Sequence, residues 1–340
     1  MDETPLCPYF GSCGGCAYQD LTYEDELSLK EENLQKLFER ELGISPEIFR
    51  PIVPSPEPYG YRTRLDLSFR RQRGEVVMGF MSEGTRRLVD IGSCSIARPE
   101  ISGFLPRLRE EAGAMLPENY RSANLVVKAG ADGRTRWGGI GRGSLRMVER
   151  DYFSAEIEGK RIFYSLDCFF QANLGILPRA LESLRSLLGL TPETCLLDLY
   201  SGVGLFWVVF AREAHAVWAV EESGSALRVA EFNQRYHHLS NVFLKEGKTE
   251  DLFEEVLAEL DGRPRAAIVD PPRQGLGPRA LEKLAQEKSI RPLVYVSCHP
   301  PSLVRDLGRF LEAGWRVDRV VPHDFFPRTR HLETLVRLWS

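Results

Sequence analysis

From about residue 171 to the C-terminus, short apolar segments alternate with longer amphipathic ones, and this alternation restricts the fold more than any other feature of the chain. Apolar segments suited to β-strands lie at 195–200, 216–220, 242–245, 266–270, 293–297, 317–322 and 332–338. The segments between them have the spacing of surface helices. This alternation predicts a parallel, doubly wound α/β sheet, whose ligands bind at the carboxyl ends of its strands.

The preceding part of the chain has a different pattern. Polar and apolar residues alternate with a period of two from Arg62 to Arg70, as in a half-buried strand. Hairpin turn sequences are found at 72–75, 130–133 and 158–160. With one helix expected over 99–114, these signals predict a smaller antiparallel α+β domain.

The patterns divide the chain into three segments. Residues 1–50 comprise a loop rich in glycine and cysteine, followed by a charged helix over 21–42. Residues 51–165 form the antiparallel domain, and residues 166–340 form the doubly wound domain. The net charge of the chain is −4, and the three segments carry −7, +5 and −2. The middle segment is therefore the one best suited to contact the phosphates of a nucleic acid.

The sequence also bears on location and assembly. No apolar run approaches the roughly 18 residues that a membrane-spanning helix needs. The N-terminus lacks the basic and then apolar pattern of a secretory signal. We therefore expect a soluble cytoplasmic protein that contacts no membrane. Nothing in the sequence requires a protein partner, so we expect a monomer.

One predicted strand runs into a glycine turn, Leu-Leu-Asp-Leu-Tyr-Ser-Gly-Val-Gly-Leu-Phe (196–206). Gly202 and Gly204 allow a sharp turn and the close approach of a ligand. Glu221, at the end of the next strand, can accept hydrogen bonds from the two hydroxyl groups of a ribose. The third glycine of a dinucleotide site is missing. This favours S-adenosylmethionine as the ligand. A strand–turn–helix corner without a ligand is the alternative.

Two further strands end in reactive side chains. Asp270 begins Asp-Pro-Pro-Arg, and Cys298 lies in Ser-Cys-His-Pro. Both strand ends should open on the same crevice as the glycine turn. A helix that starts near Pro300 would stabilise the Cys298 thiolate and lower the pKa of this thiol. A lone cysteine is more often a buried, inert core residue, but the position at the crevice favours a reactive one.

A thiolate in this place suits one chemistry in particular. Carbon 5 of uracil is a poor nucleophile, and a thiolate that adds at carbon 6 converts the ring to an enolate, which can attack a sulfonium methyl group. A base must then remove the proton on carbon 5. Glu333, in Arg-Thr-Arg-His-Leu-Glu-Thr (328–334), is the candidate base. A surface carboxylate is the alternative interpretation of Glu333.

The seven cysteines are unevenly distributed. Cys7, Cys13 and Cys16 have the spacing Cys-x5-Cys-x2-Cys, and Cys94 offers a fourth thiolate. Four thiolates fit a structural 4Fe-4S cluster, and they also fit a tetrahedral zinc ion. The iron–sulfur cluster is the prediction, with zinc as its alternative. The other two, Cys168 and Cys195, lie among apolar residues and are expected in the core.

Taken in order, these motifs resemble a known family, the RNA uracil-5-methyltransferases that carry an iron–sulfur cluster and act on ribosomal or transfer RNA. The resemblance covers nearly the whole chain. It rests on the cysteine set, the glycine turn and four short motifs, which are Phe-Phe-Gln-Ala-Asn (169–173), Asp-Pro-Pro-Arg (270–273), Ser-Cys-His-Pro (297–300) and His-Leu-Glu-Thr (331–334). It implies a Rossmann-like methyltransferase domain that uses S-adenosylmethionine.

The resemblance also implies roles for individual residues. Cys298 would be the nucleophile and Glu333 the base. The residues matching cofactor-binding positions are Gln171, Tyr200, Glu221 and Asp270. Phe169 matches an aromatic residue that packs near the target base, which would be flipped out of the RNA fold. For contacts to RNA we expect Arg62, Arg64 and Arg273.

The sequence departs from the family at three points. Many relatives begin with a β-barrel TRAM domain, whereas this chain starts at the cysteine loop. Leu205 stands where several relatives have a polar residue near the cofactor, and His299 stands where Asn is common. By analogy with the shorter members, the first departure favours 23S ribosomal RNA as the substrate, with uridine 54 of transfer RNA as the alternative.

Two other functions share some of these sequence features. A cytosine-5 methyltransferase shares the thiolate chemistry, but typically places its nucleophile beside a proline in a Pro-Cys pair, unlike Ser-Cys-His-Pro. A non-catalytic RNA-binding protein with a degenerate methyltransferase fold is the other alternative. The presence of Gly202, Gly204, Asp270, Cys298 and Glu333 together argues against it.

Overall fold

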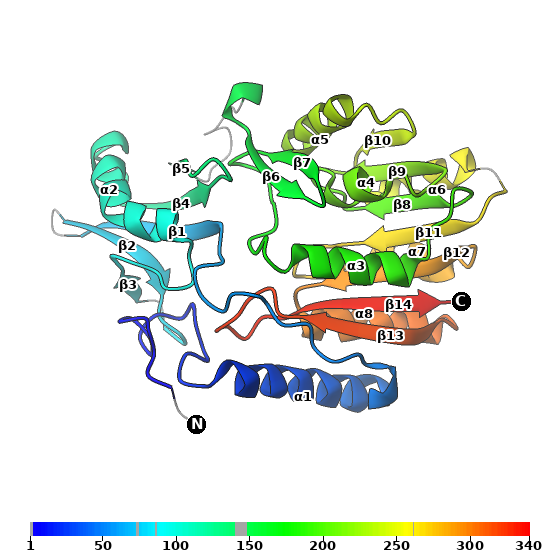
Figure 1. The fold of residues 1–340 in the computed structure, drawn as a ribbon, viewed down its shortest axis with the longest axis horizontal. Coiled ribbons are helices and arrows are strands. Elements are labelled where there is room, and N and C mark those ends of the chain that lie inside the picture. Colours follow the sequence, from blue (N-terminus) through cyan, green and yellow to red (C-terminus); the bar gives the residue numbers. More distant parts are fainter. Residues whose placement is uncertain (1–2, 73–74, 86, 140–147, 261) are drawn as a thin grey trace.

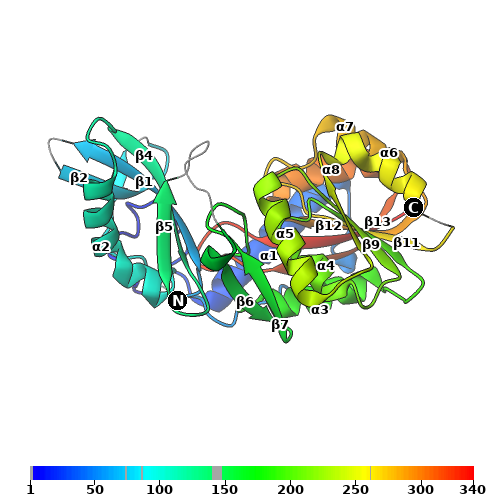
Figure 2. The ribbon, with the colours of Figure 1, turned by 90° about the horizontal axis from the view of Figure 1, so that it is seen from above.

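The computed structural model describes residues 3–72, 75–85, 87–139, 148–260 and 262–340. It consists of a large α/β unit and a smaller unit rich in β-strands, which lie side by side in Figure 2. Figure 1 shows the strands of the large sheet stacked one below another, with helices in front of them and behind them. None of the described helices is long and apolar enough to cross a membrane.

The large unit is built on a seven-stranded sheet with the order β10-β9-β8-β11-β12-β14-β13. Its strands are β8 (Cys195–Leu199), β9 (Ala216–Glu221), β10 (Val242–Glu246), β11 (Arg265–Val269), β12 (Ile290–Ser297), β13 (Arg316–His323) and β14 (Glu333–Trp339). All seven predicted strands are present. The five from β10 to β12 are parallel, as predicted. The predicted doubly wound sheet is therefore present, and it departs from parallel pairing only at β14, which is antiparallel to both of its neighbours.

The reversal of β14 follows from its short connection. Parallel neighbours need a crossover of about a dozen residues or more, whereas only residues 324–332 join β13 to β14. These two strands therefore form a hairpin in which His323 pairs with Glu333. The first residue of β14 consequently lies at the edge where the parallel strands end, which is the edge that binds ligands in this type of sheet.

Helices cover both faces of the large sheet (Figure 1). They are α1 (Tyr23–Leu42), α3 (Leu177–Leu188), α4 (Leu205–Phe210), α5 (Gly224–His237), α6 (Thr249–Glu259), α7 (Pro278–Gln286) and α8 (Pro300–Glu312). One apolar core contains side chains of α3, α4 and α5, and the other contains side chains of α1, α6, α7 and α8. In β8, Leu196 faces the first core and Leu197 the second, as expected from the period of two. The N-terminal helix α1 thus packs on the large unit, against α8.

The smaller unit contains the predicted antiparallel sheet, with the order β3-β2-β1-β4-β5. Its elements are β1 (Arg64–Gln72), β2 (Glu75–Met81), β3 (Leu88–Asp90), α2 (Pro99–Met115), β4 (Ser122–Ala129) and β5 (Thr135–Gly139). A separate hairpin follows, formed by β6 (Phe153–Ile157) and β7 (Lys160–Tyr164), and two short 3-10 helices lie at Pro46–Ile48 and Glu149–Asp151. Helix α2 covers one face of the five-stranded sheet through its buried side chains Ile101, Leu105 and Leu108. Of the predicted turn at 72–75, residues 73–74 lie outside the described residues.

Candidate functional site

The glycine turn connects β8 to α4 at the ligand edge of the large sheet. Gly204 has φ +97° and caps α4, and a Cβ atom at this position would lie 2.2 Å from the Trp207 indole. The Glu221 carboxylate accepts hydrogen bonds from the backbone N–H of Gly202 (2.8 Å) and of Ser223 (2.7 Å). The acidic strand end predicted to bind a ribose is therefore fixed directly against the turn.

Asp198, one position before the last residue of β8, is a candidate functional residue that the sequence analysis did not single out. Its side chain is fully buried, and within the described part of the chain neither carboxylate oxygen has a hydrogen-bond partner of good geometry. Burial, followed by the charge of Asp270, raises the pKa of Asp198 well above its usual range, and the Trp207 backbone N–H offsets part of this shift. A buried carboxyl without a partner is costly unless a ligand satisfies it. The available signal was an acidic residue inside an otherwise apolar strand.

We expect Gly204→Ala to lower the free energy of unfolding by about 2–4 kcal/mol, because alanine disfavours a positive φ and its methyl group would clash with Trp207. Cofactor affinity should fall with it. Chemical denaturation and calorimetric titration with S-adenosylhomocysteine measure the two effects. Gly103→Ala, in α2 with open space around the Cβ position, is the matched control and should raise stability by up to about 1 kcal/mol. Equal stability of the two variants would contradict the argument.

The structure brings the predicted nucleophile and base together. Ser297, the last residue of β12, pairs with Thr334 of β14, so Cys298 and Glu333 flank this pair at the ligand edge. Asp270 follows β11, the other neighbour of β12. Glu333 is 6% exposed and Cys298 is half-buried. Both carboxyls are close enough to the thiol to act on its pKa.

These neighbours reverse the expected pKa shift of the thiol. Burial, and then the charges of Glu333 and Asp270, raise the pKa of Cys298 to about 12, while Arg273 opposes the shift. The prediction of a lowered pKa is therefore wrong for the free protein, because burial beside two carboxyls outweighs the N-terminus of α8. Burial also raises the pKa of Asp270 to about 7 and that of Glu333 well above its usual range. Each of these shifts favours the neutral form of its group, and a cation bound among them would favour the charged forms.

His299 has a defined structural role where relatives commonly have Asn. It is the N-cap of α8, and its Nδ1 accepts a hydrogen bond from the Ser302 backbone N–H. Asn caps helices in the same way, so this departure preserves the start of α8. On the same edge, Nη2 of Arg273 lies 2.8 Å from Nδ1 of His331. Leu205, at the start of α4, is buried in the apolar core.

The segment with Phe169 and Gln171 is held by the smaller unit. Buried Lys128 of β4 donates hydrogen bonds to the carbonyls of Ser165 (2.8 Å) and Cys168 (2.6 Å). The Thr63 backbone N–H donates to the carbonyl of Ala172 (2.8 Å). The Phe169 side chain is 66% exposed, whereas Gln171 is 8% exposed. An aromatic ring this exposed on a fixed loop is free to stack on a base.

The predicted arginines are in different environments. The Arg64 guanidinium pairs with Asp66 (2.6 Å) and donates to the carbonyl of Cys168 (3.3 Å), so it supports the loop that carries Phe169. Arg62 lines the cavity formed by the N-terminal cysteines, and its Nε donates to the carbonyl of Arg64 (3.0 Å). Of the three arginines, Arg273 lies at the active-site edge.

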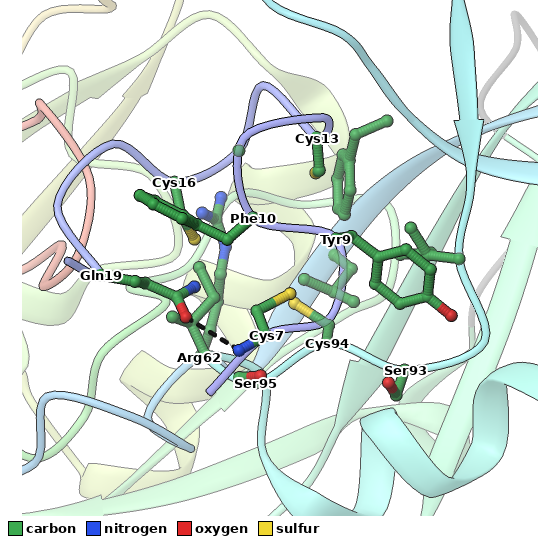
Figure 3. Close-up of a pocket in the computed structure, with 15 residues that line it drawn as sticks. Cys7, Tyr9, Phe10, Cys13, Cys16, Gln19, Arg62, Ser93, Cys94 and Ser95 are labelled. Carbon is green, nitrogen blue, oxygen red and sulfur yellow. Dashed lines mark hydrogen bonds between the residues drawn. The ribbon is translucent and has the colours of Figure 1, made fainter. Parts of the chain in front are cut away.

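The four predicted metal ligands line one cavity, together with apolar residues and Arg62. Figure 3 shows Cys7, Cys13 and Cys16 entering it from the N-terminal loop and Cys94 from the segment that follows β3. The loop packs tightly on β2, because a Cβ atom on Gly14 would lie 2.7 Å from the Met81 carbonyl oxygen. Cys168 and Cys195 are buried elsewhere in the core, as predicted.

Burial disfavours the ionised form of three of the thiols in this cavity. Burial raises the pKa of Cys16 to about 12, and the charges of the other three cysteines add to the shift. Burial also raises the pKa of Cys13 and of Cys94. In the described part of the chain, no group of three or more histidine, cysteine, aspartate or glutamate side chains is arranged to hold a single metal ion.

The fold and the site together define a class. The seven-stranded sheet is mixed, with a glycine turn after β8 and an acidic residue at the end of β9. Reactive side chains follow β11 and β12. These features together define an α/β methyltransferase of the S-adenosylmethionine-binding type.

Comparison with known proteins gives the family. The family model described as tRNA (Uracil-5-)-methyltransferase matches residues 138–340. The tRNA (uracil(54)-C(5))-methyltransferase of Schizosaccharomyces pombe is 30% identical, with 99% of this chain and 66% of that protein covered. An uncharacterized RNA methyltransferase of Caldanaerobacter subterraneus is also 30% identical, with 97% of this chain and 83% of that protein covered. The chain belongs to the tRNA (uracil-5-)-methyltransferase family, which confirms the predicted enzyme class.

A solved structure agrees with this assignment at the level of the fold. Pyrococcus abyssi tRNA (uracil-54, C5)-methyltransferase, solved in complex with S-adenosyl-L-homocysteine, superposes with a TM-score of 0.72 at 22% sequence identity. The match covers 96% of this chain and 86% of that structure.

Proposed function

We propose that this protein methylates carbon 5 of a uridine in RNA, using S-adenosylmethionine and a covalent adduct between the uracil and Cys298. The observation that carries the proposal is the meeting of Cys298, Glu333 and Asp270 at the ligand edge of the sheet. All the residues involved come from one chain, so a monomer suffices. Free thiols in the cysteine cavity suit a reducing compartment such as the cytoplasm.

The residues at the glycine turn fit the cofactor. Glu221 is fixed beside the turn to accept hydrogen bonds from the ribose hydroxyls, and the unpartnered Asp198 carboxyl suits the ammonium group of the methionine tail. Tyr200 and Glu222 line a hollow beside them that suits the adenine. The cofactor set predicted from the sequence consists of Tyr200, Gly202, Gly204 and Glu221 together with Gln171 and Asp270, and we propose that Asp198 and Glu222 add to it. When bound, S-adenosylmethionine supplies an electrophilic methyl group.

The protein residues carry the remaining steps. The Cys298 thiol gives its proton to solvent, and its sulfur forms a bond to carbon 6 of the uracil, which makes carbon 5 nucleophilic. Once carbon 5 is methylated, it still carries its original proton. The Glu333 carboxylate takes this proton, the C5–C6 double bond re-forms, and the C6–S bond breaks to release the thiolate.

The residues proposed to contact RNA are chosen by where they lie in the structure. Phe169 is exposed and fixed by the smaller unit, and Arg273 lies at the active-site edge. We assign residues 51–165 to RNA contact, with Arg64 ordering the loop that carries Phe169. Large-subunit ribosomal RNA and transfer RNA are both candidate substrates. The family and the S. pombe relative support transfer RNA, and 23S ribosomal RNA stays a prediction from the sequence.

A labelling experiment tests the function. Anaerobically purified protein is incubated with methyl-labelled S-adenosylmethionine and with unmodified transfer RNA or 23S ribosomal RNA, and the labelled nucleoside is identified after digestion. Label in 5-methyluridine from one RNA supports the proposal and selects the substrate. Label in 5-methylcytidine would assign the enzyme to cytosine, and bound cofactor without label in any RNA would overturn the catalytic proposal.

We also propose that Cys7, Cys13, Cys16 and Cys94 bind a 4Fe-4S cluster. The four thiols share one cavity, and burial raises the pKa of Cys13, Cys16 and Cys94, so a bound cation would favour the thiolate form of these three. A cubane cluster takes one thiolate on each of four irons, which matches the four cysteines that line this cavity, and a tetrahedral zinc ion is the alternative.

We expect anaerobically isolated protein to contain iron and acid-labile sulfide and to absorb visible light. Cys16→Ser should lose most of this iron because it removes one of the four ligands. Cys195→Ala, a buried cysteine in the core of the large unit, is the matched control and should keep it. Iron assay and absorbance spectroscopy measure the outcome. Zinc in place of iron would contradict the cluster.

A further inference from the structure

The loop 324–332 leads directly into the candidate base, and a buried network holds it against α1. Lys30 Nζ lies 2.7 Å from Oδ1 of Asp324 and 2.7 Å from Oε1 of Glu26, and it donates a hydrogen bond to the carbonyl of Phe326 (3.1 Å). The side chains of all three charged residues are no more than 3% exposed. The loop therefore depends on contacts with helix α1, which lies outside the hairpin.

Arg328 forms the centre of these contacts. Its backbone N–H donates to Oε1 of Glu26 (2.7 Å), and its carbonyl accepts from the backbone N–H groups of Ala17 (2.8 Å) and Tyr18 (3.2 Å). Ala17 and Tyr18 follow Cys16 directly in the chain. One residue of the active-site loop is thus bonded to the segment that carries the predicted cluster.

The conformation of Arg328 indicates that its surroundings impose it. Its φ of +66° is unusual for a residue other than glycine and persists only where neighbouring contacts enforce it. Its side chain is 3% exposed, and the guanidinium lies 4.7 Å from the centre of the Tyr59 ring. Beside it, the Tyr61 hydroxyl donates to the carbonyl of Pro327 (3.0 Å). The peptide at this point is held from several sides.

Local hydrogen bonds continue from Arg328 to the end of the loop. The Thr329 hydroxyl donates to the carbonyl of Phe326 (2.8 Å), and the His331 backbone N–H donates to the Thr329 hydroxyl (3.2 Å). Glu333 follows two residues later, at the first pair of the β13–β14 hairpin. A shift of the peptide at 328 would therefore reach the Glu333 carboxylate through a short, bonded path.

We propose that Arg328 is a positioning residue that couples the cysteine loop to Glu333. It holds the loop in the conformation in which the carboxylate meets the proton on carbon 5 of the adduct. The inference rests on the proposed function. It assigns the cysteine loop a part in the last step of the reaction, the release of the methylated uridine from Cys298.

The test measures release separately from adduct formation. Wild-type protein, Arg328→Lys and Arg328→Ala react in a single turnover with labelled RNA and S-adenosylmethionine, and the covalent protein–RNA adduct is quantified on denaturing gels. Arg337→Ala, which loses an arginine–aspartate pair with Asp318 farther along the same hairpin, is the matched control. Hydrogen exchange of the backbone amides of residues 324–333 reports on the loop itself.

The Arg328 guanidinium also donates hydrogen bonds to the carbonyls of Leu21 (2.8 Å) and Tyr18 (3.3 Å). We expect Arg328→Lys to slow adduct release about tenfold and to speed exchange in the loop, because lysine keeps the charge but loses the planar group that makes these two bonds. Adduct formation and cofactor affinity should change less than twofold. Removing iron from the wild-type protein should slow adduct release similarly. Removing iron from Arg328→Lys should slow release little further, since both changes break the same connection between the cysteine loop and Glu333.

Two outcomes would overturn the inference. One is normal release in Arg328→Lys despite faster loop exchange, and the other is equal slowing in Arg337→Ala. If Arg328→Ala does not fold, the release rate of Arg328→Lys still tests the inference. A wild-type protein that forms neither adduct nor 5-methyluridine would instead reject the proposed function, so the two failures are distinguishable.

Discussion

Replacing Cys298 with alanine is expected to reduce methyl transfer to RNA by at least about 10⁴-fold, because the alanine methyl group cannot form the bond to carbon 6 that the proposed thiolate makes. Cofactor affinity should remain within about twofold, since the glycine turn and Glu221 lie on other strands. Labelled methyl incorporation and calorimetric titration measure the two quantities. Loss of turnover with intact binding would place Cys298 in the chemistry.

Cys195→Ala is the matched control, because it removes a thiol from the core of the same sheet and should leave turnover largely intact. The raised pKa adds a second readout. With a pKa of about 12, the Cys298 thiol should react slowly with iodoacetamide at pH 8 in the free protein. Residual methylation above about 1% in Cys298→Ala would show that another nucleophile is in use.

The sequence predicted the strands of the large sheet well, because most of them are short, largely apolar segments such as Cys195–Leu199, in which Asp198 is the one charged residue. It did not predict the direction of β14, which depends on the length of a loop rather than on the composition of the strand. That reversal is what brings Glu333 beside Cys298. The motif order identified both residues, and only the topology explains why they meet.

The ionisation states and supporting contacts of the site residues depend on three-dimensional surroundings, which a local sequence pattern does not reveal. The helix start at Pro300 suggested a lowered thiol pKa, but the two carboxyls that raise it come from strands far away in the sequence. Arg328 was likewise hidden. Its partners Ala17 and Glu26 lie about 300 residues earlier in the chain. Among the candidate site residues, the sequence therefore predicted identities better than ionisation states or supporting contacts.

Glu333→Gln is expected to allow methylation of the bound uridine but to slow release of the adduct by about 10³-fold, because the amide cannot take the proton from carbon 5. Covalently linked, methyl-labelled RNA should therefore accumulate to nearly one equivalent on denaturing gels. In the wild type, release should quicken as pH rises, since the pKa of Glu333 is raised and only its carboxylate form acts as a base. The variant should lose this dependence on pH.

A measurement of stability separates this effect from misfolding. A carboxyl whose pKa is raised by folding binds protons more tightly in the folded state, so its contribution to stability falls as pH rises above the unfolded pKa. Glu333→Gln should therefore unfold at a higher temperature than the wild type at pH 8, although it turns over far more slowly. Glu213→Gln, which alters an ion pair with Arg185, is the control and should change neither adduct release nor its pH dependence. Normal release by Glu333→Gln would transfer the role of base to Asp270, the other carboxyl that acts on the Cys298 thiol.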